Sequence, residues 1–212
     1  MCNLYRLSKG PAEIARLFGG AADPPGNAGE SIYPGYPGLV FASGRVRQMT
    51  WGFPLRLQGM KPGSKPKPVN NARTDKLDNF MWRYSFAERR CLIPVTEFCE
   101  AEGEKGAKTR TWFSLPNEEV FAVAGIWRET DEWGLAYSMV MTDACAQVEG
   151  VHDRMPVILS RETWGDWLDG PPDGAKLLCQ PYPEEMVMRR TSDPWVKRKF
   201  AGVNRCAHLR SA

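Results

Sequence analysis

The sequence predicts a single α+β domain. Short apolar runs of strand length alternate irregularly with a few helical patterns, unlike the regular repeat of a parallel βαβ protein. The 212 residues are 42% hydrophobic and 25% charged, a composition that can bury one sizeable core. No internal repeat occurs, and no linker is long enough to separate two domains. We therefore expect residues 1–212 to form one domain.

The predicted strands are short apolar segments bounded by turn-forming residues. Ser43 and Gly44 form the predicted turn between the first two strands. Gly- and Pro-rich residues 21–38 and 61–68 are predicted to be loops, because Pro prevents regular hydrogen bonding. The predicted strands cover residues 39–42, 46–53, 91–93, 97–100, 111–115, 120–126 and 135–141.

Three helices are predicted from the spacing of apolar residues. Residues 10–18 form an amphipathic run that Ser8 is expected to cap and that ends at Gly19-Gly20. Residues 75–90 carry an apolar stripe of Leu77, Phe80, Met81 and Tyr84. Ser160 is expected to cap a third helix, whose Trp164, Trp167 and Leu168 share one face.

Basic residues are distributed unevenly along a chain whose net charge is only +3. Residues 31–74 contain no Asp or Glu, although average use predicts about five. The same span contains Arg45, Arg47, Arg56, Lys61, Lys65, Lys67 and Arg73, and a second basic stretch contains Arg189, Arg190, Lys197, Arg198, Lys199 and Arg205. Such stretches can be solvated surfaces or can follow the phosphates of a nucleic acid.

The remaining composition argues against a membrane or a metal. No apolar run approaches the roughly 20 residues that span a bilayer, and no signal-peptide pattern begins the chain. A cytoplasmic location is expected, with mostly free thiols among the six cysteines. No Cys-x-x-Cys pair exists and only two histidines occur, so no metal or other cofactor is expected.

Cys2 follows Met1 directly, and this position suggests a particular chemistry. Removal of Met1 is expected when residue 2 is as small as Cys, and it exposes an α-amine beside a thiol. Their reference pKa values, near 7.7–8.0 and about 8.5, make both groups partly nucleophilic at neutral pH. An aldehyde first forms a Schiff base with the amine, and the thiol then closes a five-membered thiazolidine. An internal cysteine cannot do this, because its nitrogen is part of an amide.

Three further motifs offer polar groups, each with a plain structural alternative. Asn71 and Arg73 can offer an amide and a guanidinium to a sugar–phosphate, or can belong to a helix cap with an exposed arginine. Glu100 stands near the end of a predicted strand, where a carboxylate can also face solvent. His152 precedes Arg154 and an apolar run, although a single histidine is more often structural than catalytic.

Together these motifs resemble the SOS-response-associated peptidase family, the abasic-site-processing proteins. The terminal Met-Cys and the string His-Asp-Arg-Met-Pro-Val-Ile-Leu are the most specific elements. The resemblance extends from residue 1 to about residue 168, and residues 169–212 match weakly. The motifs, in the family's order, are Met1-Cys2, Trp51-Gly52-Phe53, Asn71-Ala72-Arg73, Cys91-Leu92-Ile93-Pro94, Phe98-x-Glu100, Ala124 to Trp127 and His152 to Leu159.

The resemblance implies strands curled into an open barrel, with a positive channel leading to Cys2. It implies that the protein binds single-stranded DNA and captures abasic sites through a thiazolidine at Cys2, a lyase-like activity in a family also labelled as self-processing thiol peptidases. Asn71 would hold the sugar, Glu100 would orient and deprotonate the amine, and His152 would act as general acid–base. The DNA-binding residues would be Arg73, Arg154, Thr142, Trp51 and Arg56. No obligate protein partner is implied.

The sequence departs from the family pattern in three places. Asn3 and Leu4 stand where the family has Gly and Arg, which leaves open whether Arg6 replaces that arginine. Leu57 stands where the family has a second tryptophan, an aromatic residue that would stack on bases. Glu97 competes with Glu100 for the carboxylate role, and Glu100 is preferred because it keeps the spacing after Cys91-Leu-Ile-Pro.

Two other classes of function fit parts of the sequence. An N-terminal-nucleophile thiol peptidase or amidohydrolase would also use Cys2, a histidine and an asparagine, and it would turn over amides without DNA. A non-catalytic basic nucleic-acid-binding module would keep salt-sensitive binding when Cys2 is replaced.

Overall fold

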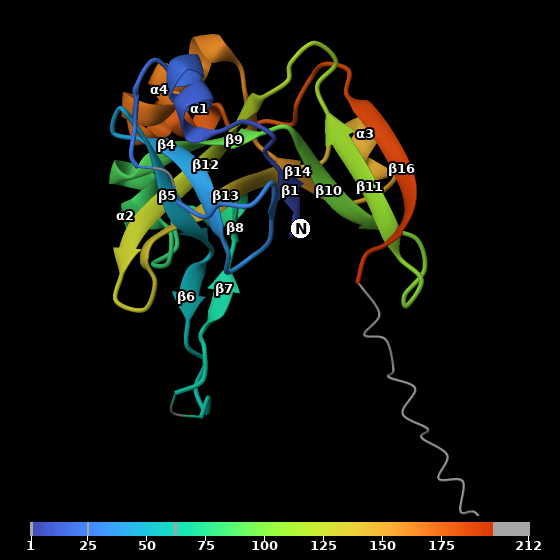
Figure 1. Cartoon of the computed structure of the whole chain (residues 1–212), viewed down its shortest axis with the longest axis horizontal. Coiled ribbons are helices and arrows are strands. Elements are labelled where there is room, and N and C mark those ends of the chain that lie inside the picture. Colours follow the sequence, from blue (N-terminus) through green and yellow to red (C-terminus); the bar gives the residue numbers. More distant parts are fainter. Residues whose placement is uncertain (1, 25, 62, 197–212) are drawn as a thin grey trace, which may run out of the picture.

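Five strands close into a barrel at the centre of the computed structural model, which describes residues 2–24, 26–61 and 63–196 (Figure 1). The barrel strands are β4 (Pro37–Ala42), β5 (Arg45–Trp51), β9 (Arg90–Val95), β12 (Phe121–Thr130) and β13 (Gly134–Asp143). Neighbouring strands are antiparallel except at the closure, where β5 and β13 pair in parallel, with Tyr137 opposite Trp51. The α+β class and the barrel core are confirmed, and the barrel is closed instead of open.

The closed barrel explains why its strands read as apolar runs. Every residue of β9 is buried, as are the first six of β12. Gly125 lets these two strands pack closely, because a Cβ there would lie 2.8 Å from the Cys91 sulfur. The predicted turn between β4 and β5 is present, and Ser43 and Gly44 both have positive φ values, 51° and 72°, as a tight hairpin requires.

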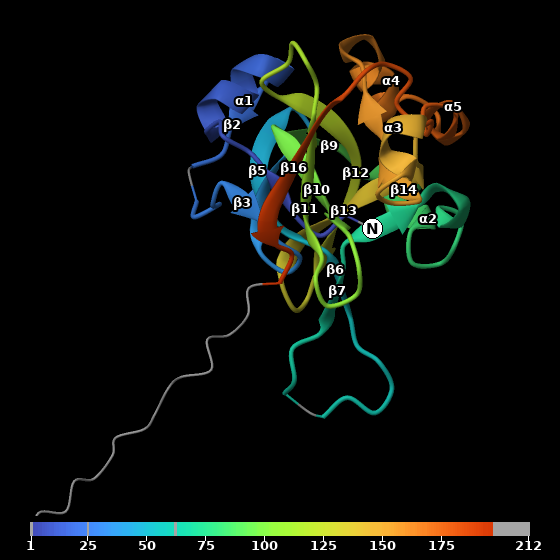
Figure 2. The ribbon, with the colours of Figure 1, turned by 90° about the vertical axis from the view of Figure 1, so that its right-hand side faces the viewer.

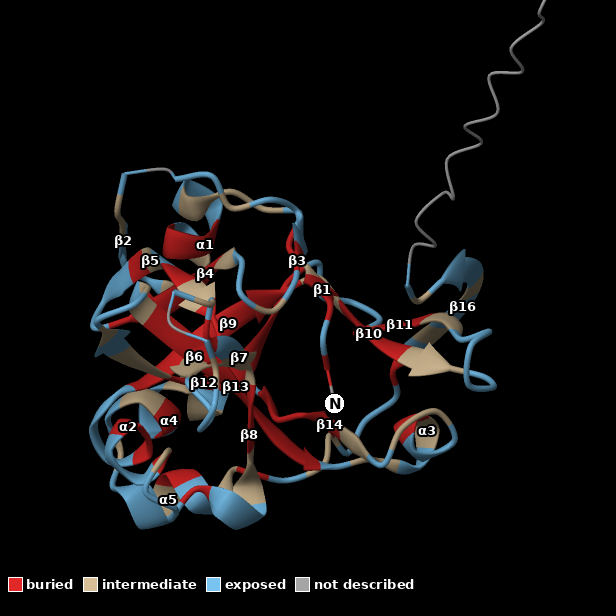
Figure 3. Cartoon of the chain, turned by 90° about the horizontal axis from the view of Figure 1, so that it is seen from below, coloured by how far each residue is buried: buried red, intermediate tan, exposed pale blue. Residues whose placement is uncertain are grey.

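A second, five-stranded sheet stands beside the barrel (Figure 3). Its spatial order is β16-β11-β10-β1-β3. In this view the N-terminal end of the chain lies between the two sheets, near β14. The strands are β1 (Tyr5–Arg6), β3 (Ser31–Ile32), β10 (Glu97–Glu102), β11 (Thr109–Ser114) and β16 (Val187–Pro194).

The remaining strands extend or edge the barrel. β6 (Phe53–Leu55) and β7 (Lys67–Val69) form a ribbon that projects from it (Figures 1 and 2). Lys67 and Pro68 were expected in a loop, but Pro68 is tolerated here because the ribbon has only two strands. The edge strands are β2 (Ala21–Ala22), β8 (Asn71–Arg73), β14 (Arg154–Pro156) and β15 (Ile158–Leu159).

Short helices lie around the two sheets (Figure 3). They are α1 (Pro11–Phe18), α2 (Arg83–Glu88), α3 (Ala146–Glu149), α4 (Trp164–Asp169) and α5 (Pro172–Leu177), with 3-10 turns η1 (Thr74–Lys76) and η2 (Arg161–Thr163). The helix before Gly19 is confirmed, but Ser8 is not its cap: its hydroxyl contacts Thr96 at 3.1 Å, while Glu13 accepts a hydrogen bond from the Gly10 amide. The aromatic face of α4 is confirmed, with Trp167 fully buried.

The continuous helix predicted over residues 75–90 is wrong. Only η1 and α2 form, and the Asn79 carbonyl between them accepts hydrogen bonds from the amides of both Trp82 and Arg83. Phe80 and Tyr84, expected on a buried stripe, are 80% and 55% exposed. Without a common buried face, packing does not support one long helix.

No helix in the described part of the chain is both long and apolar enough to cross a membrane.

Candidate functional site around Cys2

Cys2 is held at the junction of the two sheets by the strand that follows it. Tyr5 of β1 pairs with Phe98 of β10, and the Leu4 carbonyl accepts a hydrogen bond of 2.9 Å from the Cys99 amide. The Cys2 side chain is fully buried, and its thiol donates to the Leu4 carbonyl at 3.5 Å. Burial, followed by the negative charge of Glu100, raises the pKa of the thiol well above its usual value. The thiol is therefore protonated at neutral pH.

Two adjacent asparagines bind the Cys2 carbonyl. The side-chain amides of Asn70 and Asn71 donate to the same oxygen, at 2.9 and 2.7 Å. Asn70 also donates to the side-chain oxygen of Asn3 at 3.1 Å. Asn71 is buried, and its Oδ1 has no hydrogen-bond partner among the described residues, so it can accept a hydrogen bond from a bound molecule.

Trp51 fixes the backbone that carries these asparagines. Its indole N–H donates to the Asn70 carbonyl at 3.0 Å, and the Met139 amide of β13 donates to the same carbonyl at 2.9 Å. The indole is fully buried and stacks on Tyr137. A fully buried ring cannot stack on a base, so the expected direct DNA contact of Trp51 is not supported, and its indole instead holds the Asn70 backbone.

Glu97 and Glu100 have opposite surroundings. The Glu97 carboxylate accepts hydrogen bonds from Arg6 of β1 at 2.7 Å and from Arg189 of β16 at 2.8 Å. These two ion pairs connect β10 to β1 and β16. Glu100 is only 1% exposed, and burial raises its pKa to about 7. A carboxyl group with that pKa can give or take a proton near neutrality.

His152 lies at the turn before β14 with a defined hydrogen bond on one nitrogen. Its Nδ1 accepts the Arg154 amide at 3.0 Å, and burial lowers the pKa of the ring. Asp153 lies 2.9 Å from the same nitrogen, which would favour the charged ring. Because the Asp153 side chain is 84% exposed, solvent weakens that attraction, and a neutral ring with the proton on Nε2 fits both other observations.

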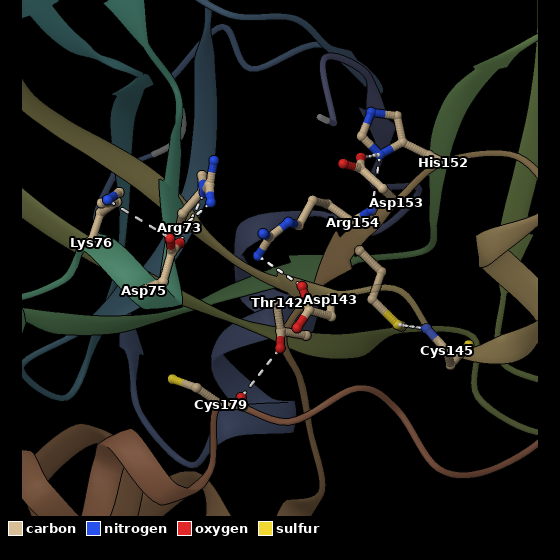
Figure 4. A network of polar contacts seen from close by, with 11 residues as sticks. Arg73, Asp75, Lys76, Thr142, Asp143, Cys145, His152, Asp153, Arg154 and Cys179 are labelled. Carbon is tan, nitrogen blue, oxygen red and sulfur yellow. Dashed lines mark hydrogen bonds and ion pairs between the residues drawn. The ribbon is translucent and has the colours of Figure 1, made fainter.

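β13 brings the two arginine-containing motifs together. It pairs with β8 on one edge, Met141 opposite Arg73, and with β14 on the other, Asp143 opposite Arg154. Figure 4 shows both guanidinium groups held by carboxylates: Arg73 by Asp75 at 2.7 Å and Arg154 by Asp143 at 3.0 Å. Phosphates that bind these arginines must compete with those partners.

Thr142 lies between these pairs in sequence, but its side chain is turned away from them. Its hydroxyl donates to the Cys179 carbonyl at 3.3 Å, and the residue is buried (Figure 4). Successive residues of a strand point to opposite faces, so Asp143 and Thr142 serve different sides of β13. The expected phosphate contact of Thr142 is therefore not supported.

Arg56 lies just beyond β6, away from Cys2, where its Nε is 3.4 Å from Glu132 and its Nη1 donates to the Ser64 carbonyl at 3.1 Å. In the second basic stretch, Arg189 pairs with Glu97 and Arg190 with Glu102. Lys197 and the basic residues after it lie outside the described residues.

A family model described as SOS response associated peptidase (SRAP) matches residues 1–197. The chain belongs to the SRAP family. Abasic site processing protein YoqW of Bacillus subtilis (strain 168) is 29% identical over 154 residues, which cover 66% of each chain. Abasic site processing protein YobE of the same organism is 30% identical over 151 residues, covering 66% of this chain and 68% of YobE. The chain thus spans about two thirds of the length of these relatives.

Solved structures share the SRAP fold of this chain. A protein from Bacteroides thetaiotaomicron superposes with a TM-score of 0.78 at 21% identity, covering 89% of this chain and 91% of its own. A protein from Bordetella bronchiseptica gives 0.77 at 22% identity, covering 90% and 99%. At these identities the similarity establishes the fold alone.

The departures from the SRAP pattern have structural explanations. Leu4 is buried against Cys99 and Trp112, where an arginine would lose its hydration. Arg6 does not replace the missing arginine at the site, because it pairs with Glu97 and stacks at 4.2 Å on Trp112. The side-chain oxygen of Asn3 accepts a hydrogen bond from the Asn70 side chain.

Sequence reasoning missed two residues of this SRAP site. Asn70 left no signal, because its side chain binds a main-chain carbonyl and belongs to no motif. Lys108 lies between β10 and β11, and its charge makes a minor contribution at two groups: burial is the main cause that lowers the pKa of His152 and raises that of Glu100, and Lys108 slightly lowers both.

Among the described residues, Cys2, Cys91, Cys99, Cys145 and Cys179 are free thiols. Cys91, Cys99 and Cys179 are buried and Cys145 is partly exposed, whereas Cys206 lies outside the described residues.

Proposed function

We propose that this protein captures abasic sites in single-stranded DNA by forming a thiazolidine at Cys2 after Met1 is removed. The observation that carries the proposal is the arrangement at Cys2: two asparagines fix its carbonyl, and the buried carboxyl of Glu100 acts on its thiol. The relatives YoqW and YobE, both named abasic site processing proteins, supply the substrate class.

The proposed reaction joins the ring-opened sugar to both nucleophiles of Cys2. The amine attacks the C1′ aldehyde, and the resulting carbinolamine loses water to give an imine. The thiol then adds to the imine carbon: the C–S bond forms, and the thiol proton passes to the nitrogen. The product is a thiazolidine and one water, with no oxidant or reductant needed. This order agrees with the raised pKa of the thiol, which leaves the first attack to the amine.

Three side chains have roles in these steps. Glu100, with a pKa of about 7, accepts a proton from the amine and returns one when water leaves. His152 donates from Nε2 to the sugar oxygen in its neutral form and serves as a strong acid in its charged form, because its pKa is lowered. The Asn71 Oδ1 accepts a hydrogen bond from a sugar hydroxyl.

Single-stranded DNA is the proposed partner because basic groups and exposed aromatic rings occur together near this site. Tyr33 and Tyr36, 37% and 63% exposed, lie in the acid-free span and form an edge-to-face pair. The Tyr36 carbonyl accepts the Trp51 amide at 2.9 Å, so the pair is fixed to the residue that holds Asn70. Rings of this kind stack on unpaired bases, and Arg73 and Arg154 supply phosphate contacts.

Intact mass and denaturing gels test the proposal with the full chain and an abasic oligonucleotide. The mature protein is expected to form one adduct with abasic single strands and none with undamaged DNA. Cys2→Ala should abolish the adduct, whereas Cys145→Ala, which removes a partly exposed internal thiol, should leave it intact. A stable adduct in Cys2→Ala refutes the thiazolidine.

The same preparation separates the alternatives. Turnover of a peptide or amide that requires Cys2 but no DNA supports a thiol hydrolase instead. Salt-sensitive binding to single strands with no adduct in the wild-type protein supports a non-catalytic binding module.

A further inference from the structure

Asn70 connects three parts of the chain that are distant in sequence: its side chain binds the N-terminal segment, and its main-chain carbonyl binds Trp51 and Met139. Its Nδ2 donates to the Cys2 carbonyl at 2.9 Å and to the Asn3 side-chain oxygen at 3.1 Å. Its main-chain carbonyl accepts hydrogen bonds from the Trp51 indole N–H and from the Met139 amide. The preceding residue, Val69, is held by the Ser138 hydroxyl at 2.6 Å. Asn70 is thus a fixed donor, attached to the barrel on one side and to the N-terminal segment on the other.

The N-terminal segment needs such a donor if Cys2 becomes the first residue. A terminal residue has only one peptide link, so its backbone is free to rotate, and fixing it costs roughly 1–2 kcal/mol. Asn70 and Asn71 together use both lone pairs of the Cys2 carbonyl. That leaves the amine and thiol as the groups of Cys2 still available for reaction, already oriented.

We propose that Asn70, braced by Asn3, is a positioning residue that fixes the Cys2 carbonyl so that the amine and thiol meet the aldehyde in reactive geometry. This inference rests on the proposed function and adds to it a residue outside the Asn71-Ala72-Arg73 motif. It also gives Asn3 a purpose: the family pattern has Gly there, which has no side chain to accept the Asn70 amide.

The test compares single-turnover rates of adduct formation at saturating abasic DNA with affinities for undamaged single strands. Asn70→Ala should slow adduct formation by several-fold, because one of two donors to the carbonyl is lost. Asn70→Asp should slow it more, about tenfold or beyond at neutral pH, because a carboxylate of the same shape repels the carbonyl. Asn3→Ala should give a smaller loss of about two- to threefold. Affinity for undamaged DNA should stay at the wild-type value in all three.

A pH series distinguishes positioning from a general structural effect. As the pH falls toward the pKa of the new carboxyl group, it gains a proton that it can donate to the Cys2 carbonyl. The rate of N70D relative to wild type at the same pH should therefore rise. A variant that only loosens the fold would show no such recovery, and its melting temperature and DNA affinity would fall together.

Wild-type rates in both Asn70 variants overturn the positioning role, as does a parallel loss of rate and DNA affinity without recovery at low pH. If Asn70→Asp does not fold, Asn3→Ala at an exposed position decides the matter by its rate. If the wild-type protein forms no adduct with DNA, the proposed function fails. The positioning role is then decided separately by thiazolidine formation with free glycolaldehyde, which any terminal cysteine can undergo and which Asn70→Asp should slow.

Discussion

Two glutamates three residues apart on β10 have different surroundings, and these favour Glu100 for the carboxylate role that we propose. Glu97 is held by two arginines, and Glu100 is enclosed beside Cys2. Glu100→Gln is expected to slow adduct formation by about 10²-fold or more, the usual contribution of a general acid–base. Glu97→Gln should change the rate by less than about twofold. Single-turnover rates check both, and the reverse order would identify Glu97 as the functional carboxylate.

Glu100 should also make the free energy of unfolding depend on pH. Its folded pKa, about 7, lies above the usual value of 4.5, so the folded state holds the proton more tightly than the unfolded state. The stability linked to this group is present below about pH 4.5 and is lost as the pH rises through 7. The loss is about 3 kcal/mol at most, from about 1.4 kcal/mol per pKa unit.

The glutamine of Glu100→Gln cannot ionise, so this variant does not lose stability as the pH rises. Its free energy of unfolding, relative to that of the wild type, should therefore be higher at pH 8 than at pH 5. Urea unfolding at both pH values measures this difference. An equal effect of the substitution at the two values would show that the Glu100 pKa is near normal.

Site residues were predictable where chemistry depends on a side chain that the sequence displays. Cys2, Asn71 and Glu100 lie together, and Arg73 and Arg154 lie on strands along the two edges of β13, whereas their roles remain predictions. Asn70 was not predictable, because its partner is a main-chain carbonyl 68 positions away. Trp51 and Thr142 were assigned to DNA on motif position alone, and only packing shows that both are buried.

At the scale of elements, two exposed aromatic pairs provide a matched comparison. Tyr33–Tyr36 and Phe80–Tyr84 both have ring centroids 6.4 Å apart in edge-to-face geometry. The first pair lies in the acid-free span. The second lies in a segment with Asp75 and Asp78, and Arg83 already covers it, 4.6 Å from the Tyr84 ring.

We expect Tyr36→Ala to weaken binding to undamaged single strands by about tenfold, since base stacking contributes about 1–3 kcal/mol. Tyr84→Ala should leave the affinity unchanged. Fluorescence anisotropy with a labelled oligonucleotide measures both. Equal losses would mean that exposed aromatic area, not its place in the basic span, decides binding.

The elements themselves were predictable to the extent that local patterns decide them. The β4–β5 turn and α4 follow from turn residues and apolar spacing. The helix over residues 75–90 failed because an apolar period exists there without a surface to bury it. The two-residue strands β1, β2 and β3 were missed because so short a segment has no period to read.

Across the whole molecule, we expect the binding of single-stranded DNA to depend on where the charges lie and not on the net charge of +3. Arg154 and its partner Asp143 are the clearest pair on which to test this. Arg154→Ala should weaken binding and reduce the slope of log affinity against log salt by about 0.7, the value for one contact with a single strand. Asp143→Asn removes the competitor of the phosphate and should strengthen binding. Titrations at several salt concentrations measure both, and an unchanged slope in Arg154→Ala would exclude a phosphate contact.

The α+β class was readable from the sequence, but closure of the barrel was not. Closure depends on the parallel pairing of β5 with β13, which are more than 80 residues apart in sequence. Neither strand carries a local signal for a parallel neighbour, because both read as ordinary apolar segments. The family resemblance implied a barrel, and the closing pair β5–β13 is seen only in the structure.

The short β5–β13 pairing has a consequence for local opening of the barrel. Along one edge, β13 exchanges β5 for β8 between Tyr137 and Met139, and the Gly52 amide donates to the Tyr137 carbonyl at 2.7 Å just before the exchange. Only two residue pairs join β5 to β13, against six between β9 and β12. A subglobal opening at this seam would release Asn70, and with it Cys2, while the antiparallel strands stay intact.

In native-state hydrogen exchange, the amides of Gly52 and Met139 should therefore exchange together and faster than those of β9. A covalently attached sugar that also contacts Asn71 would join the N-terminus to β8 across the opening. The adduct should then raise protection at both amides, because the captured lesion would hold closed the β5–β13 seam, which only two residue pairs join.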